Sequence, residues 1–452
     1  MKPRRKKPPL VTPPRANPPP PEPDRLPDAW AILALALIAM AALELADLNL
    51  PAWRQTTLWS VFNASAEVQP SAWPTPQPLL AVAAQVHTRP SDIARLFASK
   101  PGRPRPPLRI AYFADSMAEG DLITQDLRTR VQERLGGAGV GWVGMAPLDA
   151  WAREDVQQVF DANWVRRSIL KPGWEGQAYG PQGSAWNIEG GKASVQFRGS
   201  RQPWYRALAP ATLWYGPVAE TVTASVKVTV DGVERVLSLH GAQVLNALAL
   251  TDAPSQALDL EIEAPPGLDL FAVSFEQGSG VDCFSTRSSH GGPLARLDPA
   301  LLKALQAQRG YGLVIAHFGI NALSLSGDKS FKWYRRSLGD GLRNLQAGLA
   351  PAAMVLVSAT DMAQLRNGVW ASDPRLPDLL MMQEAVATDV GIPFINAFDL
   401  MGGPGSVAAW AEANPRLAEP DRVHLTLQGS KRFAEALWLA LQKGGEGPRT
   451  EP

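Results

Sequence analysis

The sequence predicts an α/β protein in which helices cover both faces of a parallel sheet and a β-rich region interrupts that sheet. Short apolar strands alternate with amphipathic helices at the start of the folded region and again toward its end, which is typical of a buried parallel sheet. The stretch between them alternates apolar and polar residues with a period of two. The chain has 452 residues, 45% of them hydrophobic, which is enough for two or three domains.

The N-terminal tail, residues 1–28, has a composition that cannot form a packed core. Residues 1–27 contain eleven prolines, and residues 1–28 carry seven basic and three acidic side chains. Because the whole chain has 44 basic and 43 acidic residues, the remainder has 37 against 40, a net charge of −3. The tail is expected to stay extended. The slightly acidic remainder offers no basic face, which excludes nucleic acid as a partner.

Residues 29–50 are predicted to cross a membrane as a signal anchor. Every residue from 29 to 43 is apolar (AWAILALALIAMAAL), and the stretch reaches about 20 residues, near the length of a bilayer span. The basic tail on its N-terminal side predicts that the tail stays in the cytoplasm and the rest is exported. The alternative is a cleaved signal peptide, because the uninterrupted apolar run is only 15 residues long.

The exported part is predicted to have three regions. Residues 51–107 are rich in proline and form a linker with one short helix. The α/β domain comprises residues 108–148 and 278–445. An inserted β-sandwich, residues 149–277, lies between its two parts and is rich in Gly, Trp and Thr.

The α/β domain is predicted from four strands. The first, at residues 108–113, precedes an amphipathic helix over residues 122–135. The other strands are expected at residues 312–318, 353–358 and 392–396. The single cysteine, Cys283, excludes an internal disulfide framework and a cysteine-rich zinc site.

The insertion is unusually rich in tryptophan. Exposed Trp rings stack on sugar rings, which would make the insertion a carbohydrate-binding module, whereas buried Trp rings would only form its core. Seven of the 15 tryptophans lie between residues 142 and 214: Trp142, Trp151, Trp164, Trp174, Trp186, Trp204 and Trp214.

Three short segments carry candidate catalytic residues. Ser116 follows the first strand, at the sheet edge where α/β proteins bind ligands, although an Asp-Ser pair there also serves as a plain helix cap. Asp421 and His424 are three residues apart before the last helix, and a serine nucleophile needs such a base and orienting acid. Asn321 follows a buried strand, where its amide suits stabilisation of an oxyanion. The histidines show no metal-ligand spacing, so we expect no metal and no cofactor.

The order IAYFADSMAEGD, HFGIN and DRVHLTLQGS resembles the SGNH/GDSL hydrolase family. This resemblance implies a three-layer αβα fold with Ser116 as nucleophile, His424 as base, Asp421 as its orienting acid and Asn321 as an oxyanion donor, with the Ser116 backbone amide as another donor. The long insertion and the segment MGGPGSVAAW further resemble bacterial exported esterases that remove O-acetyl groups from peptidoglycan or other glycans.

The second family block, whose glycine donates to the oxyanion, is expected within FSTRSSHGGPLARLD. Gly291 is the predicted donor and Gly292 the alternative, with His290 beside them either touching substrate or lying in an ordinary loop. Ala114 stands where the family has a glycine, and Ala322 where it often has an aspartate.

The resemblance implies a bacterial serine O-acetylesterase, and the predicted anchor places it in the inner membrane with its catalytic domain in the periplasm. Its partners would be an acylated polysaccharide or peptidoglycan, the inner membrane, and an envelope acyltransferase or polysaccharide-export proteins. Two alternatives stay open. One is an acyltransferase of the same fold, and the other is a decayed glycan-binding scaffold, motivated by Ala114 and Ala322.

Overall fold

The computed structural model describes residues 90–98, 106–171, 178–200, 205–324 and 330–444. These residues all belong to one compact unit of the chain. The predicted tail and the predicted membrane anchor at residues 29–50 lie outside the described residues. None of the helices within the described ranges combines the length and the apolar character that a bilayer span requires.

A five-stranded parallel sheet forms the centre of the α/β part. Its strand order is β13-β1-β14-β15-β18, and each neighbouring pair is parallel. The strands are β1 (Arg109–Ala114), β13 (Gly280–Ser285), β14 (Tyr311–His317), β15 (Ala353–Val357) and β18 (Phe394–Ile395). Four of them coincide with strands expected from the sequence, and the sequence did not predict β13. The reason is that Asp282 and Cys283 interrupt its apolar pattern, whereas in the fold the Asp282 carboxylate is buried and accepts hydrogen bonds from Arg309 and Tyr311.

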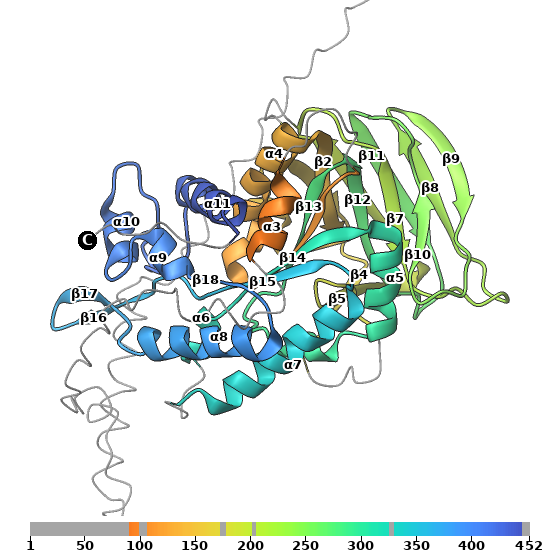
Figure 1. The fold of residues 1–452 in the computed structure, drawn as a ribbon. Coiled ribbons are helices and arrows are strands. Elements are labelled where there is room, and N and C mark those ends of the chain that lie inside the picture. The colour runs from red at the N-terminus through yellow and green to blue at the C-terminus, as the bar shows by residue number, and fades with distance from the viewer. Residues whose placement is uncertain (1–89, 99–105, 172–177, 201–204, 325–329, 445–452) are drawn as a thin grey trace, which may run out of the picture. The chain divides into compact units, whose positions relative to one another are not determined.

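Alternate side chains of the sheet face opposite layers of helices. In β1, Ile110 and Tyr112 lie in one core, and Ala111 and Phe113 lie in the other. The first face is covered by α3 (Pro90–Phe97), α4 (Leu122–Leu135), α9 (Ala397–Met401), α10 (Ser406–Glu412) and α11 (Leu427–Gln442). The other face is covered by α5 (Pro299–Arg309), α6 (Ile320–Ser324), α7 (Lys332–Gly348) and α8 (Leu376–Val390). Figure 1 shows these two layers on either side of the sheet.

Two antiparallel sheets lie between β1 and β13 in the chain. The first has the order β10-β7-β12-β5-β4, with β2 also paired to β12, and the second has the order β3-β6-β11-β8-β9. The strands of the first sheet are β2 (Gly137–Gly144), β4 (Trp164–Ser168), β5 (Ser184–Ile188), β7 (Ala211–Tyr215), β10 (Asn246–Ala249) and β12 (Leu270–Gly278). Those of the second are β3 (Val156–Phe160), β6 (Lys192–Gly199), β8 (Ser225–Val230), β9 (Val233–Ser238) and β11 (Ala257–Glu263).

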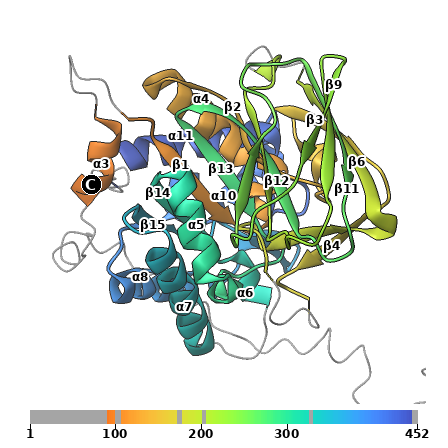
Figure 2. The ribbon, with the colours of Figure 1, turned by 90° about the vertical axis from the view of Figure 1, so that its right-hand side faces the viewer.

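The two antiparallel sheets share one hydrophobic core. In β6, Ala193, Val195 and Phe197 are buried at every second position, and Phe197 packs on Phe275 of β12 with ring centroids 5.1 Å apart. Figure 2 shows the second sheet on the side of this region that faces away from β14 and β15. The pairing of β2 with β12 means that the β-rich region begins at Gly137, before the predicted start at residue 149.

Short elements complete the described fold. They are the 3-10 helices η4 (Ser116–Asp121), η5 (Ala150–Ala152), η6 (Glu189–Gly191) and η8 (Gly292–Arg296), and the hairpin β16 (Ala363–Arg366) with β17 (Val369–Ser372).

The described tryptophans of the cluster differ in exposure. Trp142, Trp186 and Trp214 are buried, and the Trp142 and Trp214 rings lie 5.4 Å apart between their centroids. Trp164 is half-buried, and its indole N–H donates to the Ser194 carbonyl. Trp151, in η5, is 87% exposed. Core packing therefore accounts for three of these side chains, and Trp151 is available to a ligand.

Four buried charged side chains join the start of the insertion to the helices that follow β1. Arg128 of α4 contacts the carboxylates of Asp121 and Asp155 at 2.6 and 2.8 Å, and Arg153 contacts the same two carboxylates at 2.7 and 2.9 Å. Two positive charges thus balance two negative charges among side chains that are at most 7% exposed. Removing one partner would leave a buried charge uncompensated, which is strongly destabilising.

Candidate active site

Three predicted site segments leave the parallel sheet at the same edge. Because β13, β1 and β14 are adjacent and parallel, the loops after their carboxyl ends start side by side. Ser116 follows β1, Gly291 lies in the loop after β13, and Asn321 lies in α6 after β14. His424 and Asp421 reach this edge from the loop before α11.

The structure brings Ser116, His424 and Asp421 into one hydrogen-bonded chain. The distance from Ser116 Oγ to His424 Nε2 is 2.9 Å, and that from His424 Nδ1 to Asp421 Oδ2 is 2.7 Å. An ionised carboxylate only accepts, so Nδ1 carries the proton and the Nε2 lone pair faces the serine hydroxyl. In this arrangement His424 can take a proton from Ser116.

The Asp421-to-His424 spacing has a local structural cause. Oδ1 of Asp421 accepts hydrogen bonds from the backbone N–H groups of Val423 and His424, at 2.9 and 3.0 Å, which forms an Asx turn. Oδ2 remains to hold the imidazole. Burial alone would raise the pKa of Asp421, but the hydrogen bonds from the His424 side chain and the two backbone amides hold this pKa below its usual value.

Asn321 is tied to the residue that precedes the serine. Its amide Nδ2 donates to Asp115 Oδ2 at 3.1 Å and to the Ser289 carbonyl at 2.9 Å. Both amide hydrogens therefore have acceptors, so donation to an oxyanion requires one of these bonds to give way. The sequence did not predict the Asp115 contact, since the two residues are 206 positions apart.

Asp115 is a fully buried carboxyl group. Burial raises its pKa to about 6, although the hydrogen bonds from the Met117 backbone and the Asn321 amide favour the ionised form. The Met117 contact makes Asp115 the cap of η4, so the capping interpretation and the catalytic interpretation of the Asp-Ser pair are compatible.

Gly291 and Gly292 already use their backbone amides. The Gly291 N–H donates to Ser289 Oγ at 3.1 Å, and the Gly292 N–H donates to His290 Nδ1 at 3.3 Å. Gly291 also has a packing reason to be glycine, because its φ is +90° and a Cβ would lie 2.7 Å from the Leu338 side chain. His290 packs against two aromatic rings, those of Trp333 and Tyr334, at centroid distances of 5.2 and 5.8 Å.

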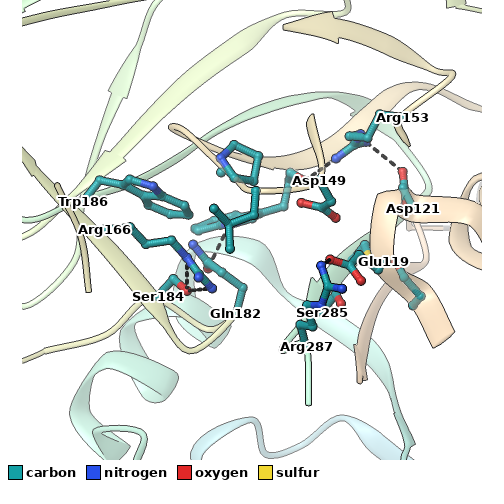
Figure 3. Close-up of a pocket in the computed structure, with 16 residues that line it drawn as sticks. Glu119, Asp121, Asp149, Arg153, Arg166, Gln182, Ser184, Trp186, Ser285 and Arg287 are labelled. Atoms are coloured by element: carbon teal, nitrogen blue, oxygen red, sulfur yellow. Dashed lines mark hydrogen bonds and ion pairs between the residues drawn. The ribbon is translucent and has the colours of Figure 1, made fainter. Parts of the chain in front are cut away.

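A pocket adjoins η4, between the serine segment and the inserted sheet (Figure 3). Its lining includes Glu119, which forms an ion pair with Arg287 at 3.1 Å, and Arg166 of β4. No local sequence motif joins Glu119, Arg166 and Arg287, because they lie far apart along the chain. Within the described part of the chain, no group of three or more His, Cys, Asp or Glu side chains is arranged to hold a metal ion.

The chain is similar to several solved structures. The chain is 22% identical to a solved peptidoglycan O-acetylesterase, with a TM-score of 0.60, and the match covers 78% of this chain and 93% of that chain. It is 11% identical to a family two carbohydrate esterase from Cellvibrio japonicus, with a TM-score of 0.25, covering 64% and 99% of the two chains. It is 13% identical to the salicylyl-acyltransferase SsfX3 of a tetracycline biosynthetic pathway, with a TM-score of 0.27, covering 66% and 97%.

The chain has an SGNH hydrolase-like fold, which confirms the resemblance predicted from the three sequence segments. No protein-family model matches the sequence, and no curated protein matches it.

The buried carboxyl of Asp115 predicts a pH dependence of stability. The pKa of Asp115 is about 6 in the folded state, against 3.8 in the unfolded state. Between pH 3.8 and about pH 6, the folded protein therefore keeps a proton on this carboxyl group that the unfolded protein has lost. Stability from this group is therefore present below about pH 4 and is lost as the pH rises through about 6. Relative to Asp115→Asn, the wild-type free energy of unfolding should fall by about 2 to 3 kcal/mol between pH 4 and 6.

Urea unfolding of both proteins at several pH values measures this difference. Asp389→Asn, which removes a partly exposed carboxylate from an ion pair with Arg335, is the control and should show a much smaller pH-dependent difference. Parallel stability curves for the wild type and Asp115→Asn would contradict the prediction.

Proposed function

We propose that the protein is a serine esterase that removes O-acetyl or similar short acyl groups from a cell-envelope or exported polysaccharide. The observation that carries this proposal is the chain of hydrogen bonds from Ser116 through His424 to Asp421, at 2.9 and 2.7 Å. The SGNH hydrolase-like fold and the likeness to a solved peptidoglycan O-acetylesterase support it.

The proposed reaction proceeds through an acyl-enzyme. His424 Nε2 takes the Ser116 proton as Oγ attacks the ester carbonyl, and Asp421 stabilises the imidazolium that forms. The tetrahedral oxyanion is stabilised by N–H donors at the sheet edge, for which the Ser116 amide, Asn321 and Gly291 are the candidates. The imidazolium then protonates the departing sugar oxygen. Water, activated by His424, releases the carboxylic acid and restores Ser116.

Exposure of the base favours hydrolysis over transfer. The side chains of His424 and Asp421 are 43% and 48% exposed, so water reaches the base that activates it. An acyltransferase, the first alternative, would need to exclude this water so that a sugar hydroxyl could intercept the acyl-enzyme. The intact hydrogen-bonded chain argues against the second alternative, a decayed glycan-binding scaffold.

We also propose that residues 29–50 anchor the protein in the bacterial inner membrane, with residues 108–445 in the periplasm. The uninterrupted apolar run and the basic tail before it support this location. There the enzyme would meet acylated polysaccharide or peptidoglycan, beside an envelope acyltransferase or polysaccharide-export proteins.

Replacing the nucleophile should abolish the reaction. We expect Ser116→Ala and His424→Ala each to lower kcat/KM for 4-nitrophenyl acetate by about 10⁴-fold or more, because the triad acts as a unit. The double variant should be less than about tenfold worse than either single variant. Asn321→Ala removes one of several donors and should cost about 100- to 1,000-fold.

Release of 4-nitrophenol and of acetate measures these effects, with circular dichroism as the check on folding. A folded Ser116→Ala protein with wild-type activity would mean that another residue is the nucleophile. A folded wild-type protein that releases no acetate from any ester would overturn the proposed function.

Trp151 is proposed to stack on a sugar ring of the polymer. It is anchored to the serine segment, because Asp149 Oδ2 accepts from the Gly120 N–H at 2.6 Å and a Cβ on Gly120 would lie only 2.7 Å from Ala152. Trp151→Ala should raise KM for an acetylated polysaccharide about 3- to 10-fold and leave 4-nitrophenyl acetate hydrolysis unchanged. Leu439→Ala, at a 51% exposed apolar residue on α11, is the control. An unchanged KM in Trp151→Ala would exclude the stacking role.

The proposed topology is tested by reporter fusions after residue 60 in a bacterial host. Alkaline phosphatase, which needs export, should be active at this site, because the positive tail stays in the cytoplasm. A fusion of the same reporter after residue 28 should be inactive. An inactive alkaline phosphatase after residue 60 would contradict the proposed anchor.

A further inference from the structure

The pocket beside η4 contains a cation whose charge is not matched by a contacting carboxylate. The pocket has a volume of about 80 Å³, and its charged lining residues are Glu119, Asp121, Asp149, Arg153, Arg166 and Arg287. Arg153 is paired with Asp121, and Arg287 is paired with Glu119. Among the residues that the structure describes, Arg166 has no carboxylate within ion-pair distance.

Arg166 is positioned by a hydroxyl group rather than by a counter-charge. Its Nε and Nη2 donate to Ser184 Oγ at 3.1 and 2.8 Å, across the β4 and β5 pair. Figure 3 shows the guanidinium beside Ser184, extended from the inserted sheet toward the side of the pocket that holds Glu119 and Asp149. Burial lowers the pKa of Arg166, and the fields of Asp149 and Glu119 only partly offset this effect. The half-buried cation is thus under-compensated.

The two carboxylates whose charges act on Arg166, those of Asp149 and Glu119, contact other groups of the protein. Asp149 accepts the Gly120 N–H at 2.6 Å, a bond that holds η5 against η4. Glu119 forms its ion pair with Arg287. Neither contacts Arg166, so an incoming anion would not have to break an existing ion pair to reach the guanidinium.

The pocket lies beside the segment that carries the proposed catalytic serine. Glu119 lies in η4, which begins at Ser116, and Ser285, another lining residue, donates its hydroxyl to the Asp115 carbonyl at 2.9 Å. A polymer whose acyl group lies at Ser116 could therefore place a neighbouring sugar in this pocket.

We propose that Arg166 binds the carboxylate of an acidic sugar in the acylated glycan, so that the preferred substrate is an anionic, uronate-like polymer. A guanidinium matches a carboxylate with two parallel hydrogen bonds and holds it more strongly than a neutral donor does. Arg166 is a substrate-binding residue in this proposal. The inference rests on the proposed esterase function and deepens it by naming the substrate class.

A matched pair of polymers tests the proposal. O-acetylated polygalacturonate carries carboxylates, and the same polymer, carboxyl-reduced before acetylation, has the same backbone without them. We expect the wild type to have a higher kcat/KM for the acidic polymer. Arg166→Gln should lower kcat/KM for the acidic polymer about tenfold, mainly by raising KM. Its kcat/KM values for the reduced polymer and for 4-nitrophenyl acetate should stay within about twofold of the wild-type values. Arg166→Lys, which keeps the charge, should recover part of the loss.

Arg198→Gln is the control for a general change in charge, because Arg198 is an insertion arginine that is paired with Asp259 outside the pocket. Arg198→Gln should leave kcat/KM unchanged for both polymers. Equal wild-type activity on the two polymers, or an equal loss on both in Arg166→Gln, would overturn the proposal while the esterase function stands. A wild type that hydrolyses neither polymer nor 4-nitrophenyl acetate would instead overturn the proposed function itself.

Discussion

The buried cluster of two arginines and two aspartates fixes the position of the insertion relative to Ser116, the proposed nucleophile. Asp121 ends η4, which begins at Ser116, and Arg128 lies on the helix that follows. Arg153 and Asp155 belong to the first part of the inserted region. The four side chains are at most 7% exposed, so each charge depends on the others for compensation. Separating the insertion from η4 would break these ion pairs and leave the buried charges without partners. The ion pairs therefore keep the pocket and Trp151 beside the segment that carries Ser116.

Two aspartates of the candidate active site, Asp421 and Asp115, lie in different environments. Asp421 is half-exposed, accepts three hydrogen bonds and has a pKa below its usual value, which suits a permanent anion that supports a histidine. Asp115 is fully buried, and its pKa is raised to about 6. Its carboxylate accepts hydrogen bonds from the Asn321 side chain and from the Met117 backbone amide in η4. In the proposed mechanism, one carboxylate therefore assists the proton transfer, and the other positions Asn321, a candidate oxyanion donor.

The sequence predicted those features that short segments encode. The apolar runs at β1, β14 and β15 identified the parallel sheet, and the spacing of Asp421 and His424 follows from one Asx turn. Features that depend on distant partners could not be predicted from local residue patterns, and the pairing of Ser116 with His424, 308 positions apart, was expected only from the family resemblance. The strand β13 contains the buried Asp282, whose partners Arg309 and Tyr311 lie more than 25 positions away. Residue type alone does not reveal that Trp142, in the paired strand β2, is buried and that Trp151, in η5, is exposed.

The central claim is that Ser116 carries the acyl group during turnover, and mass spectrometry of the quenched enzyme tests it most directly. After rapid mixing with 4-nitrophenyl acetate and acid quench, the account predicts a transient acetyl adduct on the peptide that contains Ser116, formed with a burst of 4-nitrophenol. The adduct should be absent from Ser116→Ala. Steady acetate release without an adduct, or with an adduct on a different residue, would contradict the account.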